Sequence, residues 1–61
     1  MKLTDQRLAE MWCELNRDKI PLELEECGFD PHNSSEVTAA MMVIVAAIGF
    51  DRCLEEWNRD R

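Results

Sequence analysis

Apolar residues recur every three or four positions through the first part of the chain, as on one face of a helix. This stripe consists of Leu8, Met11, Trp12 and Leu15. Thr4 can cap the free backbone N–H groups of a helix, and Asp5 places a negative charge in the first turn, where it suits the helix dipole. Because Pro21 pushes Ile20 out of the α conformation, the pattern predicts an amphipathic helix over residues 4–19.

Residues 21–27 form a short segment that begins at a proline and is followed by a glycine. Its leucines alternate with acids as in a strand, but a lone strand would have no partner in this chain. Proline early in a helix and glycine just past its end are typical of helical turns, so we expect one or two turns here. Phe29 would then pack back on Leu24, and residues 28–34 form a loop.

The segment 35–58 has the most unusual pattern. Between residues 37 and 50 only Thr38 is polar, and helical periodicity continues without a break to the last residues. The candidate caps are Asn33, Ser34 and Ser35. The pattern predicts one long helix over residues 35–58, apolar all round in its first half and amphipathic in its second. Gly49 indicates close packing, a slight bend, or a tolerated residue without a role.

These elements predict a small all-α protein with a single domain over residues 1–61. A domain of about 60 residues hides only about 60% of the surface of its unfolded chain, and the two shorter elements can cover only part of the long helix. The remaining side needs a second copy or a different protein, so we expect a helical-bundle homodimer; a tetramer satisfies the same requirement. The predicted dimer interface consists of Ala39, Ala40, Val43, Ala46, Ala47, Phe50 and Leu54.

Charge narrows the choice of partners. The chain has 13 acids and 7 lysines and arginines, with a net charge of -6, and the basic residues are scattered rather than gathered on one face. This excludes an ordinary nucleic-acid binder and favours a protein partner with a basic surface. We predict partner-binding residues at Glu23, Glu25, Glu26, Trp12 and Trp57; both tryptophans are also candidates for the core, since a chain this small needs its large apolar groups for burial.

No motif indicates catalysis or a metal. His32 lies close to acids and hydroxyls in sequence, but turn and cap chemistry explains those neighbours. Cys13, Cys27 and Cys53 lack the short spacing of a structural zinc site, and two of them lie on apolar stripes, where cysteine acts as a small hydrophobe. We therefore expect no catalytic residue, no metal and no cofactor.

The apolar run also raises the question of location. Residues 37–50 are shorter than the roughly 20 apolar residues that span a bilayer, so we expect no membrane insertion. Charges are spread through the first twenty residues, a pattern unlike that of a signal peptide. A cytoplasmic protein is the resulting prediction.

The function that these features favour is a non-catalytic interaction module. A small acidic homodimer suits an inhibitor or modulator that occupies a basic functional site, as small phage or plasmid products do when they block host defence or regulatory proteins. One alternative is a helical dimer that encloses a small apolar or nucleotide-like ligand. A second alternative is a structural subunit of a larger assembly.

Overall fold

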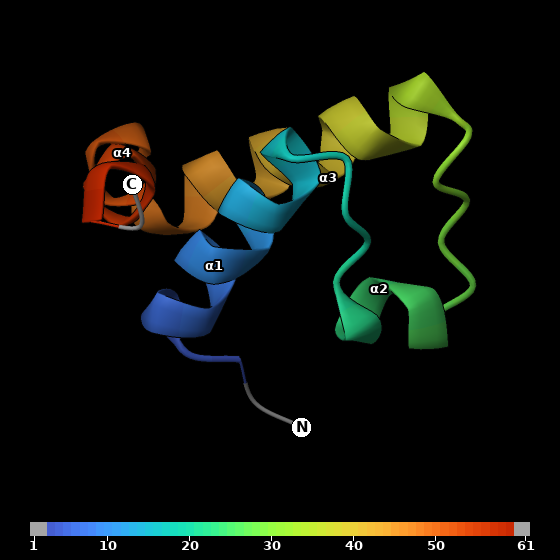
Figure 1. The fold of residues 1–61 in the computed structure, drawn as a ribbon, viewed down its shortest axis with the longest axis horizontal. Helices are drawn as coiled ribbons and strands as arrows, with labels where there is room; N and C mark the ends of the chain where they lie inside the picture. The colour runs from blue at the N-terminus through green and yellow to red at the C-terminus, as the bar shows by residue number, and fades with distance from the viewer. Residues whose placement is uncertain (1–2, 60–61) are drawn as a thin grey trace.

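The computed structural model describes residues 3–59 of the 61-residue chain, which form four helices and no strand. The helices are α1 (Asp5–Asn16), α2 (Leu22–Glu26), α3 (Ser34–Ile48) and α4 (Phe50–Arg59). α1, α3 and α4 pack on one another, whereas α2 stands apart from them on its two connecting loops (Figure 1). The all-α class expected from the sequence is confirmed.

α1 begins at the predicted cap and ends earlier than predicted. The Thr4 hydroxyl oxygen accepts a hydrogen bond from the backbone N–H of Arg7 at 3.1 Å. At the other end Asp18 adopts a left-handed conformation with a φ of 59°. The Lys19 N–H then donates to the Glu14 carbonyl at 2.9 Å, which closes the helix in a Schellman motif. The predicted end near Lys19 was wrong because an aspartate takes the left-handed position that glycine usually fills.

α2 is the short helix that the proline and glycine predicted. Gly28 has a φ of 82°, a left-handed conformation that glycine adopts without a steric cost. The Phe29 N–H donates to the Leu24 carbonyl at 3.0 Å and the Gly28 N–H to the Glu25 carbonyl at 3.1 Å, so this end is also a Schellman motif. Phe29 and Leu24 both pack, partly buried, against the core.

Asn33 is the cap that α3 uses among the three candidates. Its side-chain oxygen accepts hydrogen bonds from the backbone N–H groups of Ser35 at 3.0 Å and Glu36 at 3.3 Å. Two of the N–H groups that a helix start leaves without a partner are thereby satisfied.

The predicted continuous helix over residues 35–58 was wrong. α3 ends at Ile48, α4 begins at Phe50, and the two helices are bent by 103°. Gly49 lies between them with a φ of 90° and a ψ of 144°, a conformation that residues with a Cβ rarely adopt. The amphipathic stripe of α4 favours the bend, because a straight extension would carry α4 away from α1 and expose that stripe to water. With the bend, Cys53 is fully buried.

The core is centred on α1 rather than on the more apolar α3. Its buried members are Met11, Trp12, Cys13 and Leu15 of α1, Ile44 of α3 and Cys53 of α4. Trp12 meets two rings of α4 edge-on, with centroids 5.9 Å from Phe50 and 6.2 Å from Trp57. Ile44 is the one buried residue of α3, so much of that helix's apolar surface faces outward.

The membrane question has a specific answer for the described residues. Within residues 3–59, no single helix has the length and hydropathy required to cross a bilayer. α3 and α4 meet those limits only when they are taken together, and the bend at Gly49 separates them.

Candidate protein-interaction site

The outer side of α3 is an exposed surface without charge. We define the α3 face as Ala39, Met42, Val43, Ala46, Ala47 and the adjoining Phe50, all of which are exposed. Met42 and Val43 are each 66% exposed and Phe50 is 51% exposed. The only charged residue of α3 is Glu36 in its first turn. Contiguous apolar surface of this kind usually marks an interaction site.

A groove runs along one edge of this face. It has a volume of about 490 Å³ and is lined by Trp12, Thr38, Met41, Met42, Val45, Ala46 and Phe50. α1 contributes only Trp12, a residue that is 8% exposed, while the bend at Gly49 brings Phe50 against its ring. The groove therefore depends on the turn between α3 and α4 as well as on the apolar run.

The residues predicted for a dimer interface fall into two groups. Ala39, Val43, Ala46, Ala47 and Phe50 are exposed and belong to the α3 face. Ala40 and Leu54 are partly buried and pack against the core. Met42 was missed by the prediction, although its place three residues after Ala39 and four before Ala46 was a signal for it.

The two tryptophans predicted to bind a partner lie mainly inside the protein. Trp12 is a core residue that also lines the groove. Trp57 is partly buried against the core, and the Arg17 guanidinium lies 4.6 Å from the centre of its ring. Such a cation over an indole face is a favourable contact, and it covers part of the surface that Trp57 would offer to a partner.

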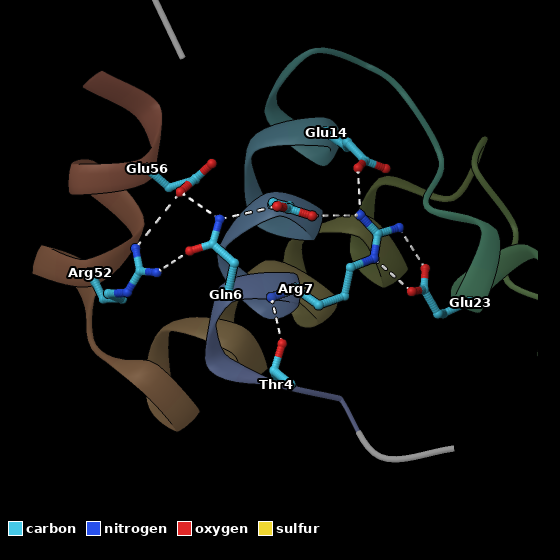
Figure 2. A network of polar contacts seen from close by, with 8 residues as sticks. Thr4, Gln6, Arg7, Glu14, Glu23, Arg52 and Glu56 are labelled. Carbon is cyan, nitrogen blue, oxygen red and sulfur yellow. Dashed lines mark hydrogen bonds and ion pairs between the residues drawn. The ribbon is translucent and has the colours of Figure 1, made fainter. Parts of the chain in front are cut away.

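The three predicted acidic residues also differ from one another. Glu23 accepts two hydrogen bonds from Arg7, at 2.6 Å from Nε and 2.7 Å from Nη2 (Figure 2). These bonds lower the pKa of Glu23 to about 2, because they stabilise its charged form. Glu25 and Glu26 are exposed to solvent. The predicted acidic surface therefore combines two kinds of residue. Glu23 is paired with Arg7, whereas Glu25 and Glu26 are exposed.

Arg7 is the cation that ties α2 to α1. Besides Glu23 of α2 it donates to Glu14 at 2.8 Å, and it lies 3.4 Å from Glu10 (Figure 2). The Glu23 and Glu14 carboxylates raise the pKa of Arg7 further above its already high value. α2 contributes no fully buried residue, so this bidentate pair fixes its position together with the partly buried Leu24.

A polar network that the sequence did not indicate joins α1 to α4. Gln6 donates hydrogen bonds to Glu10 and Glu56, each at 3.0 Å, and accepts one from Arg52 (Figure 2). Glu56 is buried, with 9% of the residue exposed. Arg52 Nη1 is also buried and has no hydrogen-bond partner in the described residues; it lies 3.8 Å from Glu56 Oε1. The network orients α4 on α1 after the bend.

The groups with potential chemistry are dispersed. The described residues contain no group of three or more histidines, cysteines and acids that could hold a metal ion. His32 lies on an exposed loop, where its backbone N–H donates to the Asp30 carboxylate at 2.9 Å. Cys13 and Cys53 are buried and Cys27 is exposed, and none of the three is in a disulfide; burial raises the pKa of Cys53 and so disfavours its reactive thiolate form.

Comparisons with protein-family models, with curated proteins and with solved structures found no match to this chain.

Proposed function

We propose that this chain is a non-catalytic interaction module that pairs with a second copy through the α3 face and offers its acidic surface to a basic protein. The observation that carries the proposal is the exposure of Met42, Val43 and Phe50 on a helix whose other side forms part of the core. Covering such side chains removes apolar area from water and favours association.

The distribution of charge supports a second copy as the occupant of this face. A basic target would be drawn to the acids on the other surfaces, because the net charge is -6 and the α3 face carries no charge. An uncharged face is best covered by another uncharged face, which the chain itself supplies. Pairing would also leave the acids of both copies in water.

The acidic surface is the part of the module that meets a different protein. Glu25 and Glu26 are exposed on α2, and acidic groups of this kind speed association with a basic site and make it sensitive to salt. Such a module acts as an inhibitor or modulator by occupying a basic functional site. We place this activity in the cytoplasm, where free thiols stay reduced.

Self-association is tested by light scattering on a sizing column over a range of concentrations. The wild-type chain is expected to shift from the mass of one copy towards the mass of two as concentration rises. Val43→Asp should hold it at one copy, because pairing would bury an unpaired charge. Leu22→Asp is the matched control, since Leu22 is 63% exposed on α2, away from the α3 face. A Val43→Asp protein that still pairs like the control would overturn the proposal.

The acidic surface has a separate test with a lysine-rich peptide as the probe. Changing Glu25 and Glu26 to lysine should weaken binding by at least tenfold at low salt, while the Arg7–Glu23 pair stays intact. Changing Glu36 and Glu55 to lysine alters the net charge equally at other exposed positions. Equal losses in both double variants would show that net charge alone, and not the α2 acids, attracts the peptide.

The groove favours one other function. Its volume of about 490 Å³ and its apolar lining fall within the range of small-molecule sites, so a small apolar ligand is the second candidate. Native mass spectrometry of the purified protein would detect a retained molecule, and Ala46→Trp, which fills the groove, should release it.

A further inference from the structure

We infer that the second copy docks antiparallel, α3 against α3, with the two-fold axis passing between Met42 and Val43. This inference rests on the proposed self-association and specifies its geometry. A two-fold interface uses the same patch on both copies, so that patch must be complementary to itself. The face meets this requirement because small residues flank a larger centre at equal distances, with Ala39 on one side and Ala46 on the other.

Side-chain sizes fit this arrangement along the length of α3. Ala39 of each copy lies opposite Ala46 of the other, and small residues at both contact points allow two helix axes to approach to about 8 Å. Met42 lies opposite Val43, where a flexible methionine side chain can fill an irregular gap. Phe50, the largest side chain of the face, follows the bend at Gly49, so the pairing register along α3 does not extend to it.

Charge selects the antiparallel orientation over the parallel one. The antiparallel pair keeps the two Glu36 side chains at opposite ends of the interface, and it sets the N-terminus of each α3 beside the C-terminus of the other, so that the two helix dipoles attract. A parallel pair would instead bring two Glu36 side chains together, along with two helix N-termini of like sign.

The available area sets the expected strength of the pair. A standard interface buries about 800 Å² on each partner, close to a fifth of the 4306 Å² that this chain exposes. α3 has 15 residues, so its face is about 22 Å long, which suits the smaller class of interfaces, below about 1,200 Å² in total. We therefore expect a pair that dissociates at micromolar concentrations and depends on the α3 face alone.

Disulfide trapping tests the orientation directly. Cys27 is first replaced by serine, because it is the exposed thiol, and Cys13 and Cys53 stay in place since they are buried. Ala39→Cys and Ala46→Cys are then made in separate chains, and each variant's helical content is checked by circular dichroism. A disulfide needs Cα atoms within about 7 Å, so a mixture of the two variants should form a cross-linked pair readily. Each variant alone should cross-link no faster than a Leu22→Cys control.

The possible results separate this inference from the proposed function. Rapid cross-linking of Ala39→Cys with itself would overturn the antiparallel orientation while self-association stands. A wild-type chain that stays at the mass of one copy at all concentrations would overturn both and would leave the α3 face to a different protein or a small molecule.

Salt gives an independent readout of the same pair. Each copy carries a charge of -6, and Glu36 and Asp51 lie at the edges of the face, so screening should reduce the repulsion between copies. Dimerisation is expected to tighten severalfold between about 0.05 and 0.5 M salt, while binding of the lysine-rich peptide weakens. Dimerisation that weakens with salt would mean that ion pairs hold the copies together, and it would overturn pairing through this uncharged face.

Discussion

The seam between α1 and α4 and the outer face of α3 differ in how they treat polar groups. At the seam, a buried glutamate, a glutamine and an arginine bond to one another beside the buried Cys53. On the α3 face, the large side chains are apolar and half to two-thirds exposed. At the seam most of the buried polar groups are hydrogen-bonded, whereas the apolar side chains of the α3 face stay exposed to water. The difference separates the surface that builds the fold from the surface that we propose for pairing.

The largest effect should come from the side chain that the core and the groove share. Trp12→Ala removes a buried indole that packs against Phe50 and Trp57. It should cost about 3–5 kcal/mol, which approaches the entire stability of a domain this small. Circular dichroism should show an unfolded chain, whereas Val43→Ser on the α3 face should keep its helical signal. A folded Trp12→Ala protein would contradict the comparison.

The polar network at the seam should have the next largest effect. Glu56→Ala removes a buried acceptor of Gln6 and the ion-pair partner of Arg52, and it should lower the free energy of unfolding by about 1–3 kcal/mol. The urea midpoint measures this loss. Glu55→Ala, a change at the exposed neighbour, should leave the midpoint nearly unchanged. If the two variants matched, apolar packing alone would account for the position of α4.

Acid should weaken the attachment of α2. Arg7 lowers the pKa of Glu23 from its ordinary value of 4.5 to about 2, so the folded state binds this proton less readily than the unfolded state. The stabilisation is complete above about pH 4.5 and is lost as the pH falls towards 2. Glu23→Gln should reduce the pH dependence of the melting temperature in that window, while Glu25→Gln should not. Identical profiles for the two variants would contradict a specific Arg7–Glu23 pair.

The smallest expected effect is a gain in stability. Asp18 ends α1 in a left-handed conformation that costs a residue with a side chain up to about 1–2 kcal/mol relative to glycine. Asp18→Gly should therefore raise the free energy of unfolding by about 0.5–1 kcal/mol, after the extra freedom of glycine in the unfolded chain is subtracted. Chemical denaturation measures the gain, and Asp18→Ala, which keeps a Cβ at this position, is the control. A loss at position 18 would mean that the aspartate side chain itself stabilises this end.

The local signals in the sequence predicted the starts of α1 and α3 and the end of α2. Thr4, Asn33 and Gly28 act through bonds to their own neighbours, so their roles are visible in a short stretch of sequence. The end of α1 at Asp18 was not visible, because an aspartate in this conformation is uncommon.

The features that depend on distant parts of the chain could not be predicted. Gln6 and Glu56 looked like ordinary solvent-facing residues, and only the packing of α4 on α1 turns them inward. The helical spacing of apolar residues continues across Gly49. Such spacing indicates which residues are buried but not where the helix axis turns, so it did not reveal the bend. The groove was missed for the same reason, since it exists only after the turn.

The turn at Gly49 also changes which substitutions the chain should tolerate. In a straight helix Ile44 and Cys53, nine positions apart, would lie about half a turn from each other, yet both are buried here. A scan of all single substitutions from Ser34 to Arg59 should therefore show two sets of substitution-sensitive positions. Each set should have helical spacing, and the second should be offset from the first. The sensitive positions before residue 49 should share a helix face with Ile44, and those after it should share a helix face with Cys53. Natural variation along this segment would follow the same rule, and selection would act on its two halves as separate units.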